Sequence, residues 1–403
     1  MSETTHVAFY PLTFAAEPDG VTVGRSDIDS YALLPVDGVE LLHQLASGMS
    51  IEEAADWYHT AFGERIDMTD FVDTLREFGF VRDGQADNEA SGVETSGIWL
   101  RRLGNALFSP AAWICYSALV LASLVEMAVH PVLRPNFHNV FFTSSLVAVQ
   151  LVLALVQMPA VLWHEWFHVL AGRRLGLSTR LGVGRRWYYF VFQTELNGLL
   201  SVPRRKRYLP FLAGMVADVL LLCALTLIAA AGLPGGLSWL NRLALAIAYT
   251  TLLRLGWQCY LFLRTDLYFV LTTALGCTNL HEATSAYLRA RLQRVPGVRP
   301  STTDDQDWSP RDRRIAPWFA LITLAGAVFV IAAAIIVVLP MGIEFVRRVS
   351  SALSEGMADE GRFWDSLISV VLLIAQFGVL PLLAGRIQKR GDEPSSRIRE
   401  ESL

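Results

Sequence analysis

The sequence is poor in charge and in cysteine, and each scarcity argues against a class of protein. Charged residues make up 18% of the 403 positions, against about 25% in ordinary soluble proteins, whereas hydrophobic residues make up 53%. A net charge of -4 gives no reason to expect nucleic acid as a partner. The four cysteines stand in apolar runs without paired spacing, which argues against a disulfide scaffold or a cysteine zinc site. The composition therefore predicts a membrane protein.

Long apolar runs define the membrane part. Each is long enough to cross a bilayer as a helix, and we predict six spans, at residues 106–129, 140–171, 209–231, 239–263, 315–339 and 363–383. Lys and Arg gather in the loops on one side of these spans, and no signal peptide opens the chain. We therefore expect a multi-pass protein of the cell (inner) membrane, in contact with lipid, with both termini in the cytoplasm.

The fold class that follows is a mainly α polytopic membrane protein with a small α+β N-terminal domain. We expect a winged-helix-like domain at residues 1–85, a linker at 86–100, the six-helix membrane domain at 101–390 and a polar cytoplasmic tail at 391–403. Within the first domain, residue patterns predict strands at 7–14, 21–25 and 31–34, with a turn at 17–20. Helices follow at 38–46, 50–62 and 69–78, the second with a capping box of Ser50 and Glu53.

The N-terminal segment resembles PqqD-like domains, which recognise the leaders of ribosomally made precursor peptides. The resemblance lies in residues 29–34, 38–42 and 75–81. It implies that a leader adds as a strand beside the third strand and against the third helix, where main-chain hydrogen bonds give affinity. The residues implied in leader binding are Tyr31, Ala32, Leu33, Leu34, Phe71 and Leu75.

Two other roles remain open for this domain. One is DNA binding, which is disfavoured because the third helix carries one Arg against three acidic residues. The other is a regulatory cap over the membrane domain.

A metal-binding pattern lies inside the second predicted span. His164 and His168 are four residues apart, so on a helix both imidazoles can face one metal ion while Glu165 reaches a water bound to it. Polar residues at this depth are costly unless they are paired, so function is the favoured interpretation. The alternative is a hydrogen-bonded polar patch between helices.

A third ligand must come from elsewhere in the chain, because tetrahedral zinc needs three protein ligands and one open position. Asp266 follows the fourth predicted span, on the side and near the depth of the two histidines. Its alternative role is a helix cap or an ion pair with Arg264. His281 and Glu282 are competing ligands, but they open a polar helix and are better explained as a solvated helix start.

The chain here resembles the site-2 protease family of intramembrane zinc metallopeptidases. His164–Glu165–x–x–His168, Asp266 on a later helix, and residues 212–218, which correspond to a Gly-Pro-x-x-Asn motif, carry the resemblance. Two departures are Leu267, where the family has Gly, and Asp218, where it has Asn. The resemblance implies zinc held by His164, His168 and Asp266, with Glu165 as the base.

Two further positions are candidates near the site. The resemblance implies a role for Asp218 behind the ligands or toward substrate, and residues 179–202 predict an amphipathic hairpin around Asn197 and Gly198. In the family such a segment lies beside the active site and holds an extended substrate. A plain interfacial anchor is an equal alternative for this hairpin.

The functional expectation is an intramembrane zinc metalloprotease that hydrolyses a peptide bond in a precursor peptide recognised by the N-terminal domain. One alternative keeps this chemistry but cleaves a membrane-bound regulator. Another is a non-catalytic peptide transporter or scaffold that uses the same polar cluster.

Overall fold

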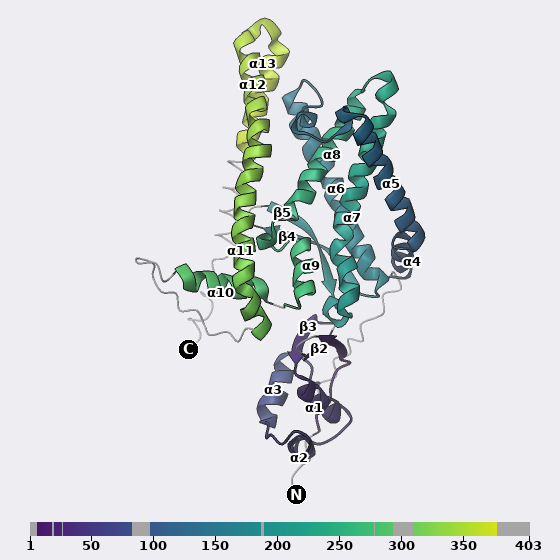
Figure 1. Cartoon of the computed structure of the whole chain (residues 1–403), viewed down its shortest axis with the longest axis vertical. Coiled ribbons are helices and arrows are strands. Elements are labelled where there is room, and N and C mark those ends of the chain that lie inside the picture. Colours follow the sequence, from purple (N-terminus) through teal and green to yellow (C-terminus); the bar gives the residue numbers. More distant parts are fainter. Residues whose placement is uncertain are drawn as a thin grey trace, which may run out of the picture.

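The computed structural model describes residues 6–17, 20–25, 27–82, 97–186, 189–277, 279–292 and 309–376. Within these ranges the chain is mainly helical, with a small three-stranded sheet in the N-terminal domain (Figure 1). Four helical segments are long and apolar enough to cross a membrane: Pro110–Val129, Leu146–Arg174, Arg204–Gly235 and Pro310–Glu355.

The N-terminal domain, called the head from here on, follows the predicted order of three strands and then three helices. Its elements are β1 (Thr13–Glu17), β2 (Gly20–Arg25), β3 (Ser30–Leu34), α1 (Val36–Ala46), α2 (Ile51–Phe62) and α3 (Met68–Glu77). The strands pair antiparallel in the order β1-β2-β3. The predicted capping box begins α2, and Gly63 ends it at a φ of 76°, a value that favours glycine.

The first strand begins later than predicted. Residues 7–12 make one isolated bridge, between Phe9 and Val81, and regular pairing starts where Thr13 lies opposite Gly24. Pairing then continues to Glu17 opposite Gly20, positions that the sequence assigned to a turn. The reason is packing, because Phe9 packs against both buried clusters of the head and so holds its segment over the core.

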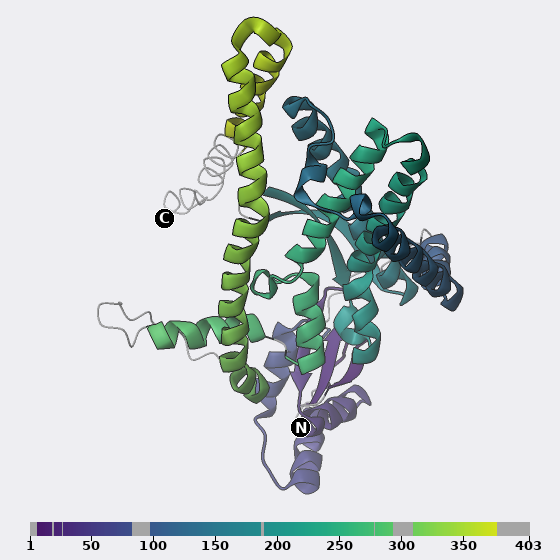
Figure 2. The same ribbon diagram turned by 45° about the horizontal axis from the view of Figure 1, so that its top comes forward.

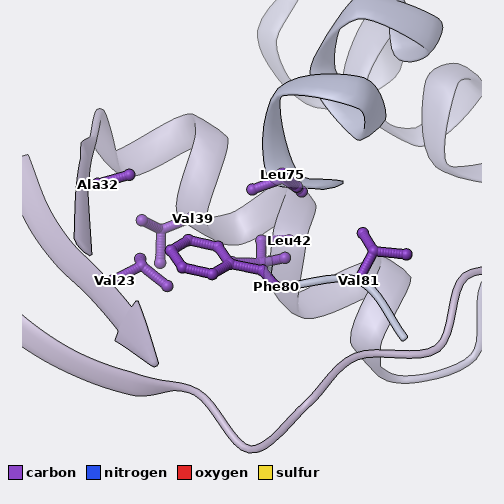
Figure 3. Packing of buried hydrophobic residues seen from close by; sticks show 7 residues of the cluster. All are labelled: Val23, Ala32, Val39, Leu42, Leu75, Phe80 and Val81. Carbon is purple, nitrogen blue, oxygen red and sulfur yellow. The ribbon is translucent and has the colours of Figure 1, made fainter. Parts of the chain in front are cut away.

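The head has its own hydrophobic core, shown in Figure 3. Phe80 is fully buried and lies between the sheet and the helices. Around it, residues from two strands, two helices and the end of the domain pack together: Val23, Ala32, Val39, Leu42, Leu75 and Val81. β3 pairs with β2 along one edge. Its other edge has no strand partner among the described residues.

The membrane part consists of helices with one β-hairpin inserted between them. Its elements are α4 (Gly97–Leu107), α5 (Pro110–Val129), α6 (Leu146–Arg174), β4 (Ser178–Arg186), β5 (Tyr189–Asn197), α7 (Arg204–Ala231), α8 (Trp239–Trp257), α9 (Asp266–Leu275), α10 (Leu280–Leu292), α11 (Pro310–Ala333), α12 (Leu339–Glu355) and α13 (Glu360–Ile374).

Helices α5 to α8 form a bundle, and the long rod of α11 and α12 stands beside it (Figures 1 and 2). In the bundle α7 packs against α6, α8 and α5. The rod leaves its apolar side chains exposed, such as Leu324 and Ile336, which is the pattern of a helix that faces lipid. The carboxylate of Asp365 on α13 accepts hydrogen bonds from Ser145 and from the amide of Leu146 at the start of α6.

Two of the six predicted spans are not among the four long apolar helices. Helix α8 covers the fourth predicted span, but it is 19 residues long and carries Arg242 and Arg254. Helix α13 is described only for Glu360–Ile374, and the rest of the predicted span at 363–383 lies largely outside the described residues. Much of the predicted linker and the whole tail also lie outside them.

The predicted hairpin is present, but its turn is elsewhere. β4 pairs antiparallel with β5 from Ser178 opposite Asn197 to Arg186 opposite Tyr189, so Asn197 and Gly198 follow the second strand instead of joining the two. The connection from Gly198 leads through a short 3₁₀ turn, Leu199–Ser201, into α7. The head lies below this end of the bundle (Figures 1 and 2).

Candidate metal centre

Two buried histidines on α6 begin the site. His164 and His168 are one helical turn apart, each is 5% exposed, and their Nε2 atoms are 3.2 Å from each other. They lie in the C-terminal half of a 29-residue apolar helix, whose regular geometry brings residues at this spacing to one face. The predicted pairing of the two imidazoles is therefore present.

Asp266 is the first residue of α9, and its carboxylate meets both histidines. Its Oδ2 atom lies 3.1 Å from Nε2 of His164 and 3.3 Å from Nε2 of His168. Gln258 holds it in place, because the Gln258 side chain donates to Asp266 Oδ2 at 3.0 Å and accepts from the Asp266 amide at 3.1 Å. Among the residues that the structure describes, His164, His168 and Asp266 are the one group of this kind close enough together to hold a metal ion.

The spacing of the three donor atoms fits a small tetrahedral ion. Bonds of about 2.05 Å to a tetrahedral metal place the ligand atoms about 3.3 Å from one another. The observed edges of the triangle are 3.1, 3.2 and 3.3 Å. Three protein ligands leave one position of a tetrahedron open, which is the arrangement of catalytic rather than structural zinc sites.

The Nδ1 atom of each histidine already has a hydrogen-bond partner, so the Nε2 atoms are the ones that face Asp266. Nδ1 of His168 lies 2.7 Å from the carbonyl oxygen of Pro210, which can only accept, so this nitrogen is the donor. Nδ1 of His164 lies 2.9 Å from Oδ2 of Asp218 and donates in the same way. When the rings are neutral, each Nε2 therefore carries a lone pair directed toward Asp266, and three ligand atoms converge as they do around a cation.

Asp218 lies behind His164 and is held by a half-buried arginine. Its side chain is fully buried, and the guanidinium of Arg254 on α8 donates to both carboxylate oxygens at 2.5 to 3.1 Å. Arg254 also donates to Gln157 at 3.1 Å. The departure from the family motif at position 218 therefore has a partner on the neighbouring helix, which neutralises the extra charge.

Gly214 on α7 lies directly against the two histidines. A Cβ atom built at this position would collide with Nε2 of both His164 and His168. The neighbouring Ala213 and Ala217 are fully buried, so α7 is packed tightly at this level. The absence of a side chain at Gly214 is what leaves room between the helices for an ion.

Glu165 is linked to the hairpin. The hydroxyl of Thr194 on β5 donates to the Glu165 carboxylate at 2.8 Å and lies 3.0 Å from its main-chain carbonyl oxygen. Glu165 is half-buried, unlike the two histidines. The hairpin packs along α6. Strand β5 therefore runs past the residue that the sequence predicts to be the base.

Several candidate residues lie away from the cluster. Asn197 ends β5, and its side chain lies outside the described parts of the structure. His281 and Glu282 open α10, as predicted, and are not part of the cluster. Glu282 pairs instead with Arg264 at 3.2 Å, so Asp266 is not engaged by that arginine.

The candidate leader-binding residues divide into core and edge positions. Leu75 is 1% exposed and Ala32 is 9% exposed, so the side chains of both lie inside the head core, while the main chain of Ala32 belongs to β3. Leu33 is exposed on β3, while Tyr31, Leu34 and Phe71 are half-buried. Burial and the carboxylate of Asp29 raise the pKa of Tyr31 to about 12, so its hydroxyl stays protonated at neutral pH.

The sequence did not identify the residues that support the ligands. Gln258, Arg254 and Thr194 carry no motif, and they reach the site only through the packing of other elements on α6. A polar residue inside an apolar span is the one general signal that marks Arg254. No protein-family profile, curated protein or solved structure matches the chain.

Proposed function

We propose that the chain is an intramembrane zinc metallopeptidase. The observation that carries the proposal is the triangle of His164, His168 and Asp266, whose inward nitrogen and oxygen atoms are of the types that bind zinc and lie at zinc-like spacing. A zinc ion bound there supplies Lewis-acid activation of a water molecule and of a substrate carbonyl. The hydrogen bonds to Asp218 and Pro210 hold the two rings in the orientation that binding requires.

Glu165 performs the proton transfers in this proposal. Its carboxylate takes a proton from the attacking water as the water oxygen bonds to the carbonyl carbon. When the carbon–nitrogen bond breaks, the same proton passes to the leaving nitrogen; the second proton of the water, left on the new carboxyl group, then passes to the amine, so the products are a carboxylate and an ammonium group. The hydrogen bond from Thr194 orients Glu165 and links it to β5. The half-exposed position of Glu165 supports access of water.

The substrate in this proposal is a ribosomally made precursor peptide, and the head binds its leader. β3 is an edge strand of five residues, and alternate main-chain groups of such a strand face its open edge, which is what strand addition needs. Binding by the head raises the concentration of peptide at the site, so the site itself needs little selectivity. The charge bias of the loops supports a multi-pass protein of the inner membrane with cytoplasmic termini.

Metal content and cleavage test the proposal together. The full chain is purified in detergent as wild type, Glu165→Gln and His164→Ala, and each is incubated with a library of soluble peptides whose products are read by mass. We expect about one zinc per chain in the first two proteins, none in the third, and cleavage by the wild type alone. Equal cleavage by Glu165→Gln would remove Glu165 as the base. A wild type without zinc would favour the non-catalytic scaffold.

A further inference from the structure

The head is fixed to the membrane part by two polar contacts at one place. The amide of Gly198 donates to Oδ1 of Asp29 at 3.0 Å. Glu17 of β1 pairs with Arg207 of α7 at 2.6 Å, and these side chains are only 11% and 7% exposed. Arg207 also donates to the carbonyl oxygens of Leu200 and Val202, so the ion pair is anchored to the connection between β5 and α7. A shielded pair with further hydrogen bonds fixes orientation better than an exposed pair does.

The hydrogen bond between Asp29 and Gly198 joins the start of β3 to the end of β5. Asp29 immediately precedes β3, and Gly198 immediately follows β5. All five residues of β3 pair with β2, and its other edge is open among the described residues. A peptide that paired antiparallel with that edge, as all strands of this sheet do, would run from Leu34 toward Ser30. Its C-terminal side would therefore leave the head beside Gly198.

From this point the candidate active site is a short distance along β5. Four residues separate Gly198 from Thr194, which is about 13 Å of extended chain. Thr194 holds the Glu165 carboxylate at 2.8 Å. An extended peptide that continued beside β5 would thus reach Glu165 after about four residues.

We propose that the docked head sets the polarity and the spacing of cleavage. The recognised segment lies N-terminal to the cleaved bond and pairs antiparallel with β3, and the bond lies about eight residues beyond the peptide residue opposite Leu33. Three of these residues reach the level of Ser30, one more reaches the level of Asp29 beside Gly198, and four span the 13 Å to Thr194 and Glu165 at about 3.3 Å each. The proposal rests on the peptidase function above and adds a fixed geometry of delivery.

A tethered peptide tests this geometry without a known substrate. Leu33 is 39% exposed, so Leu33→Cys can form a disulfide with a peptide cysteine, in a full chain whose exposed Cys115 and Cys259 are changed to Ser. The probe is a soluble 24-residue peptide with its one cysteine at position 6, and its reverse has the cysteine at position 19. We expect the first to be cut about eight residues after the cysteine, and the second to be cut at least tenfold more slowly. Moving the cysteine by two residues should move the cut by two.

Charge reversal at the docking contact provides the matched control. In the tethered protein, Glu17→Arg or Arg207→Glu alone should spread the cut positions and slow cleavage at least tenfold, with zinc content unchanged. The combined exchange E17R/R207E should restore part of both position and rate relative to either single change, because it rebuilds the pair in reverse but not the bonds to Leu200 and Val202. If the head had only to be folded, and not docked through this ion pair, the combined exchange would not restore what either single change had lost.

The outcomes separate the two proposals. The fixed geometry would be overturned if the cut position did not move with the cysteine, or if the reversed peptide were cut equally fast. Either result would leave the peptidase function standing. A protein that carries zinc but cuts no tethered peptide would overturn both. If the same protein with Glu165→Gln cut the tethered peptide as fast as the active protein does, Glu165 could not be the base and both proposals would fail.

Discussion

Gly214→Ala is the most direct probe of the space in which a metal ion would sit. The added methyl group would lie against Nε2 of both His164 and His168, closer than Cβ atoms approach other atoms in real structures. The rings cannot relax independently, because Pro210 and Asp218 hold their far nitrogens. Metal–ligand distances tolerate shifts of about 0.2 Å, and the displacement that this methyl requires is larger.

We expect zinc binding to weaken at least a hundredfold, which corresponds to about 2.7 kcal/mol. The helix itself should not suffer, because Ala is favoured over Gly inside a helix by up to about 1 kcal/mol. Gly256→Ala is the matched control, since Gly256 lies in the neighbouring α8 and no heavy atom would be within 4 Å of its Cβ. Its zinc affinity should stay within twofold of the wild type.

The assay is competition for zinc with a chelator of known affinity, followed by thermal unfolding of each protein in the same detergent. Loss of zinc by Gly214→Ala with a retained unfolding transition would support the site. If Gly214→Ala bound one zinc within threefold of the wild-type affinity, the ion could not lie between these histidines. In that case the cluster would be a polar patch.

Three further changes test the surroundings of the site and the head. Arg254→Met should weaken zinc binding at least tenfold by leaving Asp218 without its cation, and D218N/R254M should recover most of it; no recovery would contradict a charge-balancing role. Thr194→Val should lower cleavage about tenfold at unchanged zinc content, while Thr194→Ser keeps it; equal rates would show that this hydroxyl does not orient Glu165. Ser50→Ala should destabilise the head by about 1 kcal/mol in chemical unfolding; an unchanged midpoint would contradict the capping box.

The part of the site that the sequence predicts is the part that local geometry controls. His164 and His168 lie on the same face of a helix because four residues make about one helical turn. The position of Asp266 followed from a weaker argument, that the end of one span and the middle of another lie at a similar depth. The structure brings its carboxylate within 3.3 Å of both rings.

The rest of the site depends on packing that has no local signal. Arg254 meets Asp218 across 36 residues of sequence, and Thr194 meets Glu165 across 29. These contacts follow from how α8 and the hairpin lie on α6 and α7, and no spacing rule encodes that. The same limit explains the first strand of the head, whose start depends on the packing of Phe9 over a core built by later residues.

Charge also bears on whether the cluster is a metal centre or a polar patch. Around the two histidines lie three carboxylates, Asp218, Asp266 and Glu165, and one guanidinium among the described side chains that contact them, that of Arg254. With neutral imidazoles their sum is a net charge of -2 in a mostly buried, apolar setting, which is costly to maintain without compensation. A divalent cation on the three converging acceptors would cancel that charge. Protons on both imidazoles would also cancel it, so the zinc content measured at neutral pH is what distinguishes a metal centre from a hydrogen-bonded polar patch.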